Sequence, residues 1–185
     1  HGGEPLLEQN ILTAFRKHWQ SQGIERQRFE LQNVQDWKQV FNALNSLSLF
    51  SSQLAIEVHG NIKPDAQSLK LLRNYLQDPM DNFLLIVFPK QESQSLKSAF
   101  FQAIEANASV VALNAYGTQQ QQRILQIEAE KIGIRLTEQA WQWLIFHHEN
   151  NLLSARNTLL GLADSFAGVD QIDVPELEQN SEFSH

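Results

Sequence analysis

The chain has no cysteine, which excludes disulfide scaffolds, thiol catalysis, zinc ribbons and iron–sulfur clusters. It is also poor in basic residues, with 14 Lys and Arg against 21 Asp and Glu, for a formal net charge of −7. A protein that binds nucleic acid by itself needs a basic surface, so this charge argues against that function. The longest apolar run covers only residues 83–88, far fewer than the ~18 residues of a membrane span. We therefore expect a cytoplasmic protein, in a reducing compartment, that does not bind a membrane.

The first part of the chain alternates between helix and strand patterns. Apolar residues recur every four positions over residues 5–22 and predict a helix with one apolar stripe, formed by Leu7, Ile11, Phe15 and Trp19. Further helix patterns begin at Asp36, at Pro64 and at Ser93 or Ser95, and strand patterns cover residues 26–31, 53–58, 82–88 and 109–113. This alternation predicts βαβ crossovers and an α/β fold with a mostly parallel sheet.

Two segments indicate where the core of this part lies. The helix pattern after Asp36 places four large apolar residues on one face, namely Trp37, Val40, Phe41 and Leu44. The strand pattern at residues 82–88 is a continuous apolar run. Such a run predicts a strand that is buried on both faces, as in the middle of a parallel sheet.

The pattern changes at Gly117. Helix patterns cover residues 118–132, 137–148 and 151–166, and Pro175 opens a further one. No strand pattern of comparable strength follows Gly117. We therefore expect an α/β domain over residues 1–116 and an all-helical domain over residues 117–185.

Nucleotide chemistry lacks its usual sequence elements. Neither G-x-x-x-x-G-K-[ST] nor G-x-G-x-x-G occurs in the chain. The turn Gly2-Gly3-Glu4-Pro5 precedes the first helix, where a phosphate loop would be, but it has no lysine, and Glu4 would repel phosphate. We therefore expect no ATPase activity and no cofactor.

A second group of residues permits an enzymatic interpretation. Glu57 and His59 lie at the end of a predicted strand, and Asp65 follows. Carboxylates in such a place can hold a magnesium ion for phosphodiester cleavage, so a metal-dependent nuclease or phosphatase using Glu57 and Asp65 is an alternative function. The adjacent His147 and His148 point about 100° apart on a helix, unlike the i, i+4 pair of a zinc site. We assign them no metal.

The segment Ser46 to Ser52 is unusual for a connection between a helix and a strand. Three large apolar residues, Leu47, Leu49 and Phe50, lie among serines where polar turn residues are expected. They either cover the core between sheet and helix or form an exposed anchor for a partner's hydrophobic pocket. The pattern alone does not decide between the two.

Three stretches, in this order, resemble the delta subunit of the bacterial DNA polymerase III clamp loader. Gly3-Glu4-Pro5-Leu6-Leu7 is similar to the family's G-[DE]-[DE]-P-L-L turn, and Leu47-Ser48-Leu49-Phe50 to its S-L-F clamp-binding element. Glu149-Asn150-Asn151-Leu152-Leu153-Ser154-Ala155 is similar to the start of its lid helix, E-G-N-L-L-x-A. The apolar strand at residues 83–87 also fits the order and spacing of the family.

The resemblance implies a RecA-like, AAA+-like domain over residues 1–116, without its first strand, and a small helical lid over residues 117–185. It also implies a subunit with no catalytic activity of its own in the DNA polymerase III holoenzyme. This subunit would bind the sliding clamp (the beta subunit) through Leu49 and Phe50, with Leu47 beside them, and help to open the ring during DNA replication. Its other implied partners are the remaining clamp-loader subunits, and DNA only weakly or through the assembled complex.

Two positions depart from the pattern of related proteins. Leu153 stands where active AAA+ lids carry an arginine that reaches the γ-phosphate, which agrees with the missing phosphate loop. Asn150 stands where family members usually have glycine. Asparagine is the next-best residue for a left-handed backbone, so we expect the turn to be kept.

Overall fold

The computed structural model describes residues 1–45, 53–79, 81–149 and 151–182. The chain divides into two compact units: residues 1–3 with 7–114, and residues 4–6 with 115–185. Among the described residues, no helix combines the length and the apolar character needed to cross a membrane.

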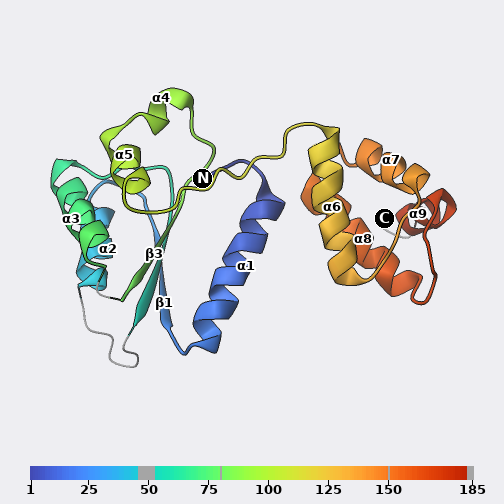
Figure 1. The fold of residues 1–185 in the computed structure, drawn as a ribbon, viewed down its shortest axis with the longest axis horizontal. Coiled ribbons are helices and arrows are strands. Elements are labelled where there is room, and N and C mark those ends of the chain that lie inside the picture. Colours follow the sequence, from blue (N-terminus) through green and yellow to red (C-terminus); the bar gives the residue numbers. More distant parts are fainter. Residues whose placement is uncertain (46–52, 80, 150, 183–185) are drawn as a thin grey trace. The chain divides into compact units, whose positions relative to one another are not determined.

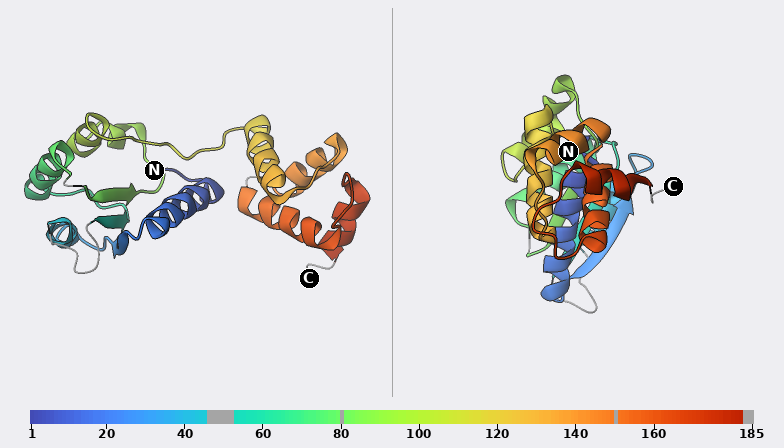
Figure 2. Two further views of the ribbon diagram at one scale, coloured as in Figure 1. Left: turned by 60° about the horizontal axis from the view of Figure 1, so that its bottom comes forward. Right: turned by 90° about the vertical axis from the view of Figure 1, so that its right-hand side faces the viewer.

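A parallel sheet forms the middle of the first unit, in the strand order β1-β2-β3. Helix α1 lies on one side of this sheet, and α2, α3 and α5 lie on the other (Figures 1 and 2). The elements are α1 (Pro5–Ser21), β1 (Glu25–Glu30), α2 (Asp36–Leu44), β2 (Leu54–His59), α3 (Ala66–Gln77), β3 (Phe83–Val87), α4 (Ser93–Leu96) and α5 (Ala99–Glu105).

Strand β2 is central, and its side chains alternate between the two faces. Leu54, Ile56 and Val58 pack into the larger core, on the side of α2 and α3. The predicted apolar face of α2 is confirmed, because all four of its residues are buried in this core: Trp37, Val40, Phe41 and Leu44. On the other face, Ala55 packs in a small cluster with Trp19 and Ile24.

Of the predicted apolar stripe of α1, Trp19 is buried, Leu7 and Ile11 are partly buried, and Phe15 is 41% exposed. Leu12, which lies outside that stripe, is buried. The turn between Leu12 and Trp19 contributes Arg16 instead, whose guanidinium reaches the buried Glu57 of β2. A charged residue, Arg16, faces the sheet at this level of α1 because the central strand β2 carries the buried carboxylate of Glu57.

The predicted strand at residues 109–113 is also wrong. Within the part of the chain that the structure describes, Leu113 alone of this segment is bridged, to Gly2, and Gly2 is bridged in turn to Pro89. Strand β3 thus pairs with β2 on one edge but is unpaired along the other among the described residues. Contrary to the predicted double-sided burial, its residues are only partly buried, and Phe83 is 37% exposed.

The single helix predicted from Ser93 or Ser95 is two short helices, α4 and α5. Ser98, between them, has an extended backbone with φ −69° and ψ 155°. The backbone hydrogen bonds of one helix cannot continue through such a residue.

The described residues of the second unit form α6 (Thr118–Ile132), α7 (Glu138–His147), α8 (Leu152–Ser165) and α9 (Val174–Glu182). These helices agree with the predicted ones. Gly133 ends α6 in the left-handed conformation, with φ 85°. The helices share one core, which includes Leu125, Trp141, Leu144, Leu159 and Leu177. The predicted fold class, a mostly parallel sheet with flanking helices followed by a helical region, is confirmed.

Gly2 provides a test of the first unit. A Cβ atom on this residue would lie 2.2 Å from the carbonyl oxygen of Leu113, whereas one on Gly3 would have no neighbour closer than 3.6 Å. We expect Gly2→Ala to lower the free energy of unfolding by about 2 kcal/mol, as overpacking does, and Gly3→Ala to change it by less than about 0.5 kcal/mol. Urea unfolding of both variants measures the difference, and equal midpoints would contradict this account of Gly2.

Candidate protein-interaction site

Leu47, Leu49 and Phe50, the predicted clamp-binding residues, lie outside the described residues. The structure does describe the residues from which their segment departs. Leu44 ends α2 and Leu54 begins β2, and each is only 1% exposed. The connection that carries the predicted anchor is therefore attached at both ends to the core of the first unit.

Asn82, just before β3, joins these two ends. Its side-chain NH2 donates a hydrogen bond to the carbonyl oxygen of Leu44 at 3.1 Å. Its side-chain oxygen accepts a hydrogen bond from the backbone N–H of Leu54 at 2.9 Å. One amide group thus satisfies the last carbonyl of α2, which lacks a partner within the helix, and the first N–H of β2.

A short turn holds Asn82 in place. The backbone N–H of Asn82 donates to the carbonyl oxygen of Pro79 at 2.9 Å. Asp81 has a φ of 61°, a left-handed conformation that aspartate and asparagine tolerate better than most residues. The hydroxyl of Tyr75 donates to the backbone carbonyl of Asn82 at 2.7 Å, and burial raises the pKa of Tyr75 to about 12. Tyr75 therefore remains a hydrogen-bond donor at neutral pH.

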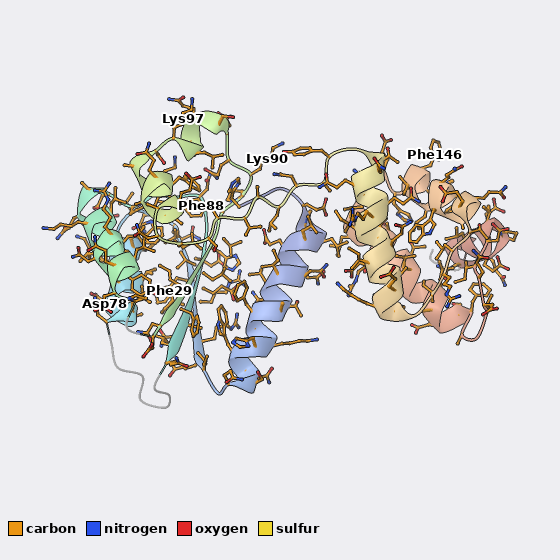
Figure 3. The ribbon with its side chains drawn as sticks, viewed as in Figure 1. Phe29, Asp78, Phe88, Lys90, Lys97 and Phe146 are labelled. Atoms are coloured by element: carbon orange, nitrogen blue, oxygen red, sulfur yellow. The ribbon has the colours of Figure 1, made fainter. Side chains whose placement is uncertain are left out.

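A groove of about 270 Å³ lies beside the same end of α2. Leu71 of α3, which lines it, is 38% exposed. Asp78, which follows α3 (Figure 3), also contributes to the lining. The remaining lining residues come from α2 and α3 and from the residue after α2, and are Phe41, Leu44, Asn45, Asn74 and Tyr75.

Glu57, the residue proposed for a metal-dependent enzyme, is fully enclosed by other side chains. Its Oε1 lies 2.5 Å from Nη2 of Arg16 and 2.5 Å from Nε2 of His59. Its Oε2 accepts hydrogen bonds from Nε of Arg16 and from Nη1 of Arg26, both at 3.0 Å. Burial raises the pKa of Glu57, but the hydrogen bonds from Arg16, His59 and Arg26 outweigh it and lower the pKa to about 2.

Asp65, the other residue of that interpretation, caps a helix. Its Oδ1 accepts a hydrogen bond from the backbone N–H of Ser68 at 2.7 Å, and this bond lowers the pKa of Asp65. Among the described residues, no group of three His, Asp or Glu side chains could hold a metal ion. Because both oxygens of Glu57 are taken by cations, the structure does not support the nuclease or phosphatase.

In the turn before α1, the side chain of Glu4 binds the start of the helix. The Glu4 carboxylate accepts a hydrogen bond from the backbone N–H of Leu6 at 3.1 Å. This is one of the N–H groups at the start of a helix that would bind a phosphate in a phosphate loop. The Glu4 carboxylate thus lies where an anion would bind, whereas the sequence predicts only that Glu4 repels phosphate.

Sequence reasoning missed Asn82, Tyr75 and Arg16. An asparagine before an apolar strand indicates a turn but says nothing of which distant backbone groups it meets.

A family model described as "DNA polymerase III, delta subunit" matches residues 2–114. The DNA polymerase III subunit delta of Escherichia coli (strain K12) is 28% identical over 184 residues, which make up 96% of this chain and 52% of that protein. The chain therefore spans about half the length of the curated relative it matches.

Two kinds of solved structure are similar in fold. The Bacillus subtilis DNA clamp loader delta protein (YqeN) matches with a TM-score of 0.68 and 13% identity, over 96% of this chain and 56% of that one. A RuvB variant from Thermotoga maritima matches with a TM-score of 0.55 and 14% identity, over 98% of this chain and 60% of that one. At these identities the two likenesses show the fold.

The Glu57 network generates a stability prediction. Glu57→Gln removes a buried carboxylate from two guanidinium groups, and we expect it to lower the free energy of unfolding by about 2 kcal/mol at pH 7. This is less than the ~3–5 kcal/mol of fully buried pairs, because the side chains of Arg16 and Arg26 are 36% and 40% exposed. The control is Glu30→Gln, which removes the exposed ion pair with Arg28. It should change the free energy of unfolding by ~0.5 kcal/mol or less.

The effect should depend on pH. Because the folded pKa of Glu57 is about 2, below its ordinary value of 4.5, its stabilising contribution is complete above pH 4.5 and is lost as the pH falls towards 2. Urea unfolding of the wild-type and Glu57→Gln proteins should therefore converge between those two values. A difference that persists unchanged at pH 2 would contradict the charged network.

Proposed function

The chain belongs to the DNA polymerase III delta subunit family, and we propose that it is a clamp-loader subunit. In this proposal it binds the sliding clamp and helps to open the ring or hold it open during DNA replication. The family match over residues 2–114 carries the proposal, because it includes the whole of the connection between α2 and β2.

Leu49 and Phe50 are the proposed anchors, with Leu47 beside them. Burying a leucine or phenylalanine side chain contributes ~1.5–3 kcal/mol. Two such anchors would provide much of the ~8 kcal/mol of a micromolar complex, before the entropic cost of association is subtracted. Firm attachment of the segment to Leu44 and Leu54, both buried, supports this assignment.

Binding alone does not open a ring. A partner shifts an equilibrium between closed and open rings only by the difference between its affinities for the two forms. The proposed subunit must therefore bind the open clamp more tightly than the closed one. No chemical step on this chain is needed, which agrees with a subunit that is not itself an enzyme.

The proposed domains are an AAA+-like α/β domain over residues 1–116 and a helical lid over residues 117–185. The N-terminal amine of His1 donates to the carbonyl oxygen of Val111 at 2.9 Å, and the N–H of Gly2 donates to that of Phe88 at 3.2 Å. Residues 1–2 thus pair on both sides, and an apolar groove of about 300 Å³ lies between β3 and residues 107–111.

The proposal also covers the other partners of the chain and its location in the cell. The other clamp-loader subunits would complete a hetero-oligomer, and a protein of this role would act in the cytoplasm. With a formal charge of −7, the chain would contact DNA only weakly or through the assembled complex.

The binding assignment is tested by Leu49→Ala with Phe50→Ala. If the two residues form an anchor, the thermal midpoint should change little, since surface substitutions stay within ~0.5 kcal/mol. Affinity for the sliding clamp of Escherichia coli should fall at least tenfold. Phe146→Ala is the matched control, because Phe146 is 77% exposed on α7, outside the segment (Figure 3), and should leave the affinity unchanged.

The alternative is that the two residues belong to the core. Core substitutions of this size cost ~2–5 kcal/mol each, so the double variant would then melt many degrees lower. A destabilised double variant, or one that binds the clamp normally, would overturn the anchor.

A separate measurement concerns nucleotide. The chain has no phosphate loop, and the Glu4 carboxylate occupies the start of α1. Isothermal titration with Mg·ATP should therefore show no site tighter than about 1 mM, an affinity that corresponds to ~4 kcal/mol. A sub-millimolar site would contradict the non-ATPase assignment.

A further inference from the structure

We propose that Asn82 is a positioning residue for the clamp-binding connection, acting through the two backbone ends that it joins. This inference rests on the proposed function, because it concerns how residues 45–53 are presented to the clamp. The observation that carries it is the pair of hydrogen bonds from one side chain to Leu44 and to Leu54.

Without the side chain of Asn82, the carbonyl of Leu44 and the N–H of Leu54 would each lose their hydrogen-bond partner. Leu44 is the last residue of α2, so its carbonyl cannot accept a bond within the helix. The N–H of Leu54 lies one residue before the first β2–β3 pair, Ala55 with Phe83. Without the amide, the last turn of α2 and the first residue of β2 can both fray.

The chemistry of the side chain is specific. The carbonyl of Leu44 needs a donor and the N–H of Leu54 needs an acceptor, and of the side chains of this size only asparagine supplies both in one planar group. Aspartate would keep the bond to Leu54 but place a carboxylate oxygen against the carbonyl of Leu44. Alanine would remove both bonds.

The surroundings hold the backbone of Asn82 in place. The turn bond to Pro79 and the hydroxyl of Tyr75 both fix the backbone of Asn82. Tyr75 also lines the groove beside the end of α2. Tyr75→Phe removes one of these bonds and keeps the ring, so it gives a milder form of the same perturbation.

Fixing the ends of a segment increases affinity by reducing the conformational freedom that is lost on binding. We expect Asn82→Ala and Asn82→Asp to weaken clamp binding about tenfold, which corresponds to ~1.4 kcal/mol. Tyr75→Phe should weaken it about twofold to threefold. An isolated peptide of residues 46–52 sets the limit, since it has the anchors but neither end fixed, and it should bind more weakly than any of these variants.

The experiment measures affinity for the sliding clamp of Escherichia coli by surface plasmon resonance, together with the thermal midpoint of each variant. Asn107→Ala is the matched control: its side-chain NH2 donates to the carbonyl oxygen of Ala103 at 3.1 Å, so it loses a comparable bond elsewhere in the first unit. It should be destabilised to a similar degree but bind the clamp normally. In the Leu49→Ala, Phe50→Ala background, Asn82→Ala should have no further effect on binding.

The outcomes separate the inference from the function. If the unmodified chain does not bind the clamp, the proposed function fails, and this inference fails with it. If the chain binds and the anchor variant does not, but Asn82→Asp and Tyr75→Phe bind as tightly as wild type, only the positioning role is overturned. An equal loss of affinity in Asn107→Ala would also overturn it, because the effect would then follow from stability alone.

Discussion

The pairing of β2 with a parallel strand on each side is the constraint on which the first unit depends. Residues Leu54 to Val58 are all buried. Each of these side chains therefore needs apolar packing or a polar partner from the neighbouring helices and strands. Leu54, Ile56 and Val58 meet this condition by apolar packing against α2 and α3. Glu57 cannot, and an isolated buried carboxylate would be costly. Arg16 of α1 and Arg26 of β1 pair with it, so one charge connects the helix and the neighbouring strand to the centre of the sheet.

The same pairing explains how residues far apart in the sequence build the base of the candidate site. All parallel strands begin at one edge of their sheet, so the residue before β3 lies near the first residue of β2. The register pairs Ala55 with Phe83, which places Asn82 next to Leu54. A side-chain amide at this position meets the start of β2 and the end of α2 together. The position of Asn82 beside the end of α2 and the start of β2 is therefore a consequence of sheet register.

Local periodicity predicted much of this structure. The apolar spacing of α2 identified its buried face, and the helices of the second unit begin and end close to the expected residues, because each depends on contacts within a few turns. The errors share a different cause. The partial burial of β3 and the failure of residues 109–112 to form a strand depend on which strands lie beside them. Arg16 and Asn82 owe their roles to partners 41 and 28 to 38 residues away. No window of local sequence contains that information.

Glu57 shows why residue type alone could not assign the function. A carboxylate at the end of a strand fits a metal site as well as it fits an ion pair, and the two differ only in what occupies its oxygens. Here Oε1 lies against Arg16 and His59, and Oε2 accepts hydrogen bonds from Arg16 and Arg26, so a metal ion could bind only by displacing an arginine. The start of α1 is likewise occupied by Glu4. Both of these polar groups are therefore used within the chain itself. A subunit that acts by binding alone can change its partner only through the difference in affinity for the partner's two forms. In the proposed function, the buried residues on either side of the connection, Leu44 and Leu54, and the Asn82 side chain that joins them would therefore contribute to this difference in affinity.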